Sequence, residues 1–120
     1  MTKAQKIRQN RQENLNKDIS EKAVKIFDWI LDKLDERVNN LDYDNTIRIY
    51  KYKDSYKLFF EYDNEPCDED LKFFFFYHDE VKLFKELQKL FHNEEGFKAD
   101  LNLDKWICGD SAIVLSVKFD

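Results

Sequence analysis

Apolar residues recur at intervals of three and four between residues 19 and 38, which is the clearest pattern in the chain. The members of this stripe are Ile19, Ala23, Ile26, Phe27, Ile30, Leu34 and Val38. One face of a helix repeats with this period, so the stripe predicts an amphipathic helix over about residues 19–38. Asp18 and Glu21 have the spacing of a capping box at its start. Residues 3–16 also favour a helix, and because no Gly or Pro intervenes, one continuous helix remains an alternative to two.

Two strands are predicted next, Thr46–Tyr52 and Tyr56–Tyr62, joined by a two-residue turn at Lys53 and Asp54. That turn places Ile49 opposite Leu58 and Ile47 opposite Phe60 on one face of the sheet. The other face takes Arg48, Tyr50, Tyr52 and Phe59. A register shift of two residues leaves both faces unchanged, because side-chain direction along a strand has a period of two.

Residues 71–77 read Leu-Lys-Phe-Phe-Phe-Phe-Tyr. Four consecutive Phe cannot alternate with polar residues, so we expect a strand whose two faces are both covered. Its inner positions are then Leu71, Phe73, Phe75 and Tyr77, whereas Phe74 and Phe76 join Tyr50, Tyr52 and Phe59 on the second face.

A second amphipathic helix is predicted over about residues 80–93, with Asp79 as its N-cap. Its expected buried stripe is Val81, Phe84, Leu87, Leu90 and Phe91, and Gly96 is a plausible stop. A hairpin around Gly109-Asp110 ends the chain. One extra residue at Asp104–Lys105 brings Leu103, Leu101 and Ala99 opposite Leu115, Val117 and Phe119, which predicts a β-bulge there.

Helices gathered around an antiparallel sheet make the expected fold class α+β. A chain of 120 residues is one domain, which we divide into a basic N-terminal helical arm, residues 1–17, and an acidic body, residues 18–120. The middle of the chain has the element order of a double-stranded-RNA-binding domain, but Asp79 and Glu80 stand where that family has bases. No apolar run suggests a membrane segment or a signal peptide, so we expect a cytoplasmic protein with free thiols at Cys67 and Cys108.

The net charge of −5 is unevenly distributed. The arm carries five bases against Glu13 and sums to +4, whereas the other 103 residues carry 15 bases and 24 acids and sum to −9. Four of these bases, Lys3, Lys6, Arg8 and Arg11, are spaced at about one helical face, so they are candidate contacts for nucleic acid or for a protein partner. The acidic body and the lack of interleaved aromatics make nucleic acid the weaker of the two.

An acidic run directly precedes the Phe-rich segment. Its members are Glu61, Asp63, Glu65, Asp68, Glu69 and Asp70. They lack the glycine-turned spacing of a calcium-binding EF-hand loop, so a partner-facing or solvated loop is preferred to a metal site. The aromatic second face (Tyr50, Tyr52, Phe59, Phe74 and Phe76) is a candidate interface, with another protein or between copies of the chain, unless a helix covers it.

Candidate catalytic chemistry is sparse. His78 and His92 are fourteen residues apart, which is no metal-ligand spacing, and no nucleophile, phosphate-loop or dinucleotide motif is present. We therefore expect no enzyme activity and no cofactor, and an enzyme stays the weakest reading.

In its length, its composition and the segment Glu61–Tyr77, the chain resembles small phage-encoded anti-defence proteins and bacterial immunity proteins. Within that group it resembles the SPbeta-type phage inhibitors of Sir2-type, NAD-depleting defence enzymes. The resemblance implies direct binding to a larger bacterial enzyme in the host cytoplasm, which would prevent NAD depletion. The alternatives are a toxin-neutralising immunity protein or antitoxin, and a nucleic-acid-binding regulator that uses the arm.

Overall fold

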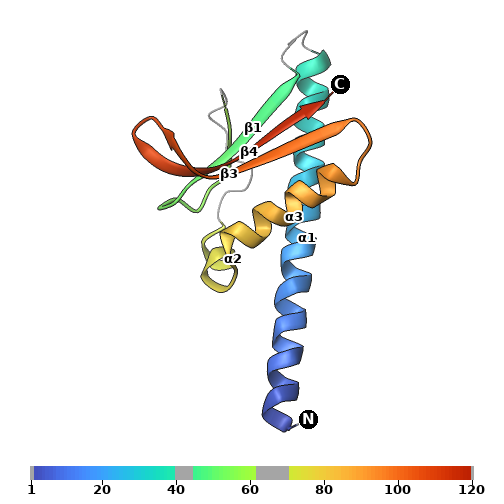
Figure 1. Ribbon diagram of the computed structural model, residues 1–120, viewed down its shortest axis with the longest axis vertical. Coiled ribbons are helices and arrows are strands. Elements are labelled where there is room, and N and C mark those ends of the chain that lie inside the picture. The colour runs from blue at the N-terminus through green and yellow to red at the C-terminus, as the bar shows by residue number, and fades with distance from the viewer. Residues whose placement is uncertain (1, 40–44, 62–70, 120) are drawn as a thin grey trace.

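The computed structural model describes residues 2–39, 45–61 and 71–119. The elements follow one another as α1 (Lys3–Asn39), β1 (Thr46–Tyr52), β2 (Phe59–Phe60), α2 (Lys72–Tyr77), α3 (Glu80–His92), β3 (Phe97–Ile107) and β4 (Asp110–Phe119). The fold class is α+β, as predicted. Figure 1 shows α1 as a long rod, whose N-terminal half projects away from the sheet and from the shorter helices.

The N-terminal part of the chain, Lys3–Asn39, forms one helix, not two. A capping box starts it, because Oγ1 of Thr2 accepts from the backbone N–H of Gln5 (3.1 Å) and Oε1 of Gln5 accepts from the backbone N–H of Thr2 (2.8 Å). The prediction of a capping box at Asp18 and Glu21 is wrong, because no helix begins there. Helix α1 runs through both residues without interruption, since nothing in that stretch breaks a helix.

The predicted apolar stripe of α1 is buried from Ile19 to Leu34, whereas the side chain of Val38 lies outside the described residues. It packs against α3, whose buried residues are Leu83, Phe84, Leu87 and Phe91. Asp79 caps α3 as predicted, and its carboxylate accepts from the backbone N–H of Val81 at 2.8 Å. The two helices and the inner face of the sheet enclose one hydrophobic core.

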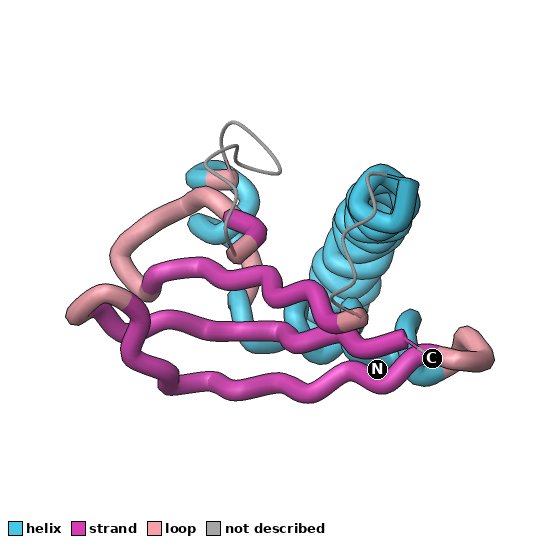
Figure 2. Tube along the Cα trace, turned by 90° about the horizontal axis from the view of Figure 1, so that it is seen from above, coloured by secondary structure: helices cyan, strands magenta, loops and turns pink. Residues whose placement is uncertain are grey.

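The sheet is antiparallel with strand order β2-β1-β4-β3. Figure 2 shows the strands as one layer with α1 rising from one side of it. Strand β1 has the predicted bounds, but the strand expected at Tyr56–Tyr62 is reduced to Phe59–Phe60, and Tyr62 lies outside the described residues. The register places Ile49, not Ile47, opposite Phe60. This shift of two residues keeps the faces, so Ile47, Ile49, Leu58 and Phe60 are all buried as expected.

The C-terminal hairpin contains the predicted bulge. The register of β3 against β4 shifts between Asn102 and Lys105. The turn lies at Cys108 and Gly109, one residue earlier than expected, since Ile107 already pairs with Asp110. Leu101, Ala99 and Phe97 therefore lie opposite Leu115, Val117 and Phe119, two residues from the expected partners but with unchanged faces.

The strand predicted over residues 71–77 is wrong, because this segment forms the short helix α2. The sheet consists of β2, β1, β4 and β3, and residues 71–77 pair with none of these strands. Without that strand, the resemblance in element order to a double-stranded-RNA-binding domain also disappears. The expected inner positions are corrected accordingly. Leu71 is buried and Phe75 half-buried, but Phe73 and Tyr77 face solvent.

Candidate functional site

Three aromatic side chains of α2 are largely exposed to solvent. Phe73 and Phe76 are each 78% exposed and Tyr77 is 62% exposed. Their spacing of three and four residues puts them on one face of the helix, and the rings of Phe76 and Tyr77 are in edge contact at 4.9 Å. We call these three residues the α2 aromatic surface.

The opposite face of α2 is anchored to the body of the protein. Leu71 is buried, and its backbone N–H donates to the carbonyl oxygen of Tyr56 at 3.2 Å. Phe74 and Phe75 pack against the core, and the Phe74 ring lies 4.4 Å from the His78 ring. Residues 71, 74, 75 and 78 thus form the inward side of this short helix and its caps, which leaves the α2 aromatic surface on the outward side.

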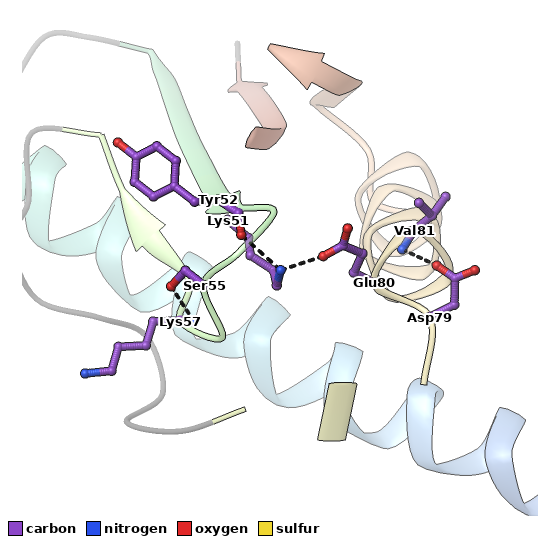
Figure 3. A network of polar contacts seen from close by, with 7 residues as sticks. All are labelled: Lys51, Tyr52, Ser55, Lys57, Asp79, Glu80 and Val81. Atoms are coloured by element: carbon purple, nitrogen blue, oxygen red, sulfur yellow. Dashed lines mark hydrogen bonds and ion pairs between the residues drawn. The ribbon is translucent and has the colours of Figure 1, made fainter. Parts of the chain in front are cut away.

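A buried lysine holds the start of α3, and with it the end of α2. Nζ of Lys51 lies 2.5 Å from Oε2 of Glu80 and donates to the carbonyl oxygen of Tyr52 at 3.0 Å. Figure 3 shows this contact reaching from β1 to the first turn of α3. The ammonium also lies 5.0 Å from the centre of the Phe75 ring, a cation–π contact. Sequence analysis missed Lys51, although its parity with Ile47 and Ile49 placed it on the core face of β1.

His78 is a second polar side chain beneath α2. Its side chain is only 5% exposed, and Nε2 lies 3.6 Å from Oδ2 of Asp18 on α1. Nδ1 has no hydrogen-bond partner among the described residues. Asp18, predicted as a helix cap, thus faces α2 instead. The other histidine, His92, contacts the backbone oxygen of Ala99 at 3.0 Å, so the two histidines serve different parts of the fold.

The predicted aromatic face divides into two separate places. Tyr50, Tyr52 and Phe59 lie together on the outer side of the sheet, with Tyr50 in contact with both other rings at 5.3 Å and 5.7 Å. Phe74 and Phe76 belong instead to the inward and outward sides of α2, because residues 71–77 are helical. Burial, followed by the charge of Tyr50, raises the pKa of Tyr52.

A pocket of about 390 Å³ opens on this outer side of the sheet. Tyr50 and Val114 line it, and the tip of the β3–β4 hairpin adds Trp106, which is 72% exposed. Arg48 and Glu61 form an ion pair at 2.8 Å in its wall. Glu61, expected to face a partner, is therefore engaged within the sheet. The remaining acids of that run, Asp63, Glu65, Asp68, Glu69 and Asp70, lie outside the described residues.

The predicted basic arm is the projecting part of α1, and its side chains are exposed from Thr2 to Asn14. With about 100° between successive residues, Lys3 and Lys6 lie on one side of the helix and Arg8 and Arg11 on another. The expectation that all four share one face is thus replaced by two pairs of bases on different sides of the rod.

Among the described residues, no three His, Cys, Asp or Glu side chains come together as metal ligands. In the same part of the chain, no helix carries an apolar run that would let it span a bilayer. Comparison with protein-family models, with curated proteins and with solved structures gave no match. The geometry of these surfaces is therefore the basis for assigning a function.

Proposed function

We propose that this protein is a small inhibitor that binds a larger bacterial enzyme through the α2 aromatic surface. The observation that carries the proposal is the exposure of Phe73, Phe76 and Tyr77 on a helix that is anchored on its other side. The backbone of an anchored helix is already ordered, so it loses little further freedom on binding, and such pre-organisation favours affinity.

Aromatic side chains are the residue type that most often dominates the energy of protein interfaces. Burying a Phe side chain contributes about 1.5–3 kcal/mol, so the three rings would supply a large part of the gross binding energy, from which the cost of association is subtracted. The acidic run precedes α2 directly in the sequence. Its carboxylates would steer the protein toward a basic surface, and the rings would then hold it there.

The partner we propose is a host antiviral defence enzyme of the Sir2-type, NAD-depleting class, bound in the host cytoplasm. This choice rests on the resemblance of the chain to small phage-encoded anti-defence proteins. Occlusion needs no catalytic group in the inhibitor, so the mechanism requires only contact across the enzyme's active or activating surface. A toxin enzyme neutralised by an immunity protein would use the same surface chemistry.

The experiment is co-expression of the protein with a Sir2-type defence enzyme during phage infection, with cellular NAD as the readout. Wild type should preserve NAD, and the variant Phe73→Ser/Phe76→Ser/Tyr77→Ser should fail to do so. The variant Trp106→Ser removes a similarly exposed aromatic from the β3–β4 hairpin, outside α2, and should still preserve NAD. Protection by the triple variant, or none by wild type, would refute the proposal for this enzyme class.

A further inference from the structure

A groove of about 490 Å³ opens where α1 and α3 diverge. Lys82, Lys85 and Lys89 of α3 line it and face Asn16 and Ser20 of α1. Their spacing of three and four residues makes the lysines one row along α3, and all three are exposed. Lys89 contacts Glu86 at 3.4 Å. Lys82 and Lys85 form no ion pair within the described part of the chain, so the groove is cationic although the whole chain is acidic.

The α1 side of the groove continues onto the projecting arm. Gln5, Arg8, Gln12 and Asn16 follow one another at intervals of three and four, so they share the face of α1 that lines the groove. The side chains of Gln12 and Asn16 are hydrogen-bonded at 3.0 Å. The exposed members of this face are amides and a guanidinium, and Ile19, which also lines the groove, is only 5% exposed. The exposed part of the face therefore lacks the apolar seam that a coiled-coil partner would need.

We propose that this groove and the projecting half of α1 bind double-stranded DNA. Amide and guanidinium side chains on an exposed helix are the groups that read base edges in the major groove, which is about 12 Å wide and admits an α-helix. Lysines beside such a helix contact phosphates. Lys82, Lys85 and Lys89 are placed for this second role, on the helix that diverges from α1.

The chemistry of the arm favours duplex DNA over other polyanions. Residues 3–17 contain no aromatic side chain, so bases of a single strand would have no stacking platform. The major groove of duplex RNA is too deep and narrow for side chains to read. The DNA-binding groove is distinct from the α2 aromatic surface, and this inference stands whether or not the proposed inhibition is correct.

The test is a titration of labelled duplex DNA with the full-length protein, followed by fluorescence anisotropy at several salt concentrations. Each phosphate contact contributes about 0.9 to the slope of log affinity against log salt. The variant Lys82→Gln/Lys85→Gln/Lys89→Gln should therefore bind more weakly, with a slope shallower by about 2.7. The control Lys57→Gln/Lys98→Gln/Lys118→Gln makes the same change in charge at exposed lysines outside the groove, and its slope should equal that of wild type.

A second variant addresses the helix itself. Arg8→Ala/Gln12→Ala replaces exposed side chains with the best helix former, so α1 remains helical. Loss of one base contact costs about 1–3 kcal/mol, and affinity for duplex DNA should fall at least about fivefold. Three results would overturn the proposal: no duplex binding at low salt, equal loss in the two lysine variants, or tighter binding of single strands, duplex RNA or polyglutamate through the same lysines.

Discussion

Nζ of Lys51 and Oε2 of Glu80 lie 2.5 Å apart and join the core face of β1 to the first turn of α3. The Lys51 side chain is 2% exposed and that of Glu80 is 27% exposed. Helix α2 ends three residues before Glu80. By holding the first turn of α3 against β1, the contact therefore also helps to hold α2 and its exposed aromatic side chains in position. The two partners differ in burial, and their replacement should therefore have unequal effects.

Glu80→Gln should destabilise the protein more than Lys51→Met. The first variant leaves an ammonium buried without its carboxylate, which costs about 3–5 kcal/mol. The second leaves only a carboxylate that water can reach, and the loss should be about 1–2 kcal/mol. Urea unfolding of both single variants and of the double variant measures the difference.

The double variant should be little less stable than Lys51→Met alone, because the contact is already lost there. Lys17→Met is the control, since the Lys17–Glu21 pair is exposed and its loss should change the free energy of unfolding by less than about 0.5 kcal/mol. Equal losses for Glu80→Gln and Lys51→Met would contradict this account of the contact.

The two sides of α2 should respond oppositely to polar substitution. Phe76→Ser removes an exposed ring, so the melting temperature should stay the same or rise. Phe75→Ser removes a ring that packs against the core and the Lys51 ammonium, and should cost about 2–4 kcal/mol. Thermal unfolding by circular dichroism distinguishes them, and a large loss for Phe76→Ser would show that the ring supports the fold.

The sequence of α2 contains a helical spacing of apolar residues, but the run of four Phe hides it. Leu71, Phe74, Phe75 and His78 follow the three-four rule, yet four consecutive Phe match a buried strand equally well. Local spacing could not decide between helix and strand, because the choice depends on the tertiary packing around the segment. The faces of β1 and β4 were predictable, since a period of two survives an error of two residues in register. The contact between Lys51 and Glu80 could not be predicted from local patterns, because it joins residues 29 positions apart.

The backbone of the hairpin turn is strained at Cys108, and a substitution at this position should relieve the strain. Cys108 has a φ of +51° and is followed by Gly109 at +89°; a type I′ turn needs positive φ at both positions. Asn tolerates this region better than Cys. Cys108→Asn should therefore raise the free energy of unfolding by about 0.5–1 kcal/mol, as measured by chemical denaturation. Cys108→Ala keeps the strain and should bring no such gain; a similar gain from both would assign the effect to loss of the thiol.

Asp104, in the bulge of β3, should make the hairpin sensitive to acid. A hydrogen bond from the Ser111 hydroxyl, followed by the Lys53 ammonium at 3.1 Å, holds the pKa of this carboxyl below its ordinary value. Its contribution to stability is therefore present above the ordinary aspartate pKa and is lost as the pH falls through the lowered pKa. The difference in melting temperature between wild type and Asp104→Asn should shrink on acidification. A difference that does not change with pH would contradict this.

The most direct test of the α2 aromatic surface is site-specific photo-crosslinking in host cells. A photoreactive phenylalanine analogue would replace Phe76 in one variant and Trp106 in another, since both side chains are largely exposed. We predict that position 76 crosslinks to one dominant protein, a defence enzyme, and that position 106 does not. Crosslinking from position 106 alone, or from neither position in cells where the protein is active, would contradict the claim that α2 is the docking surface.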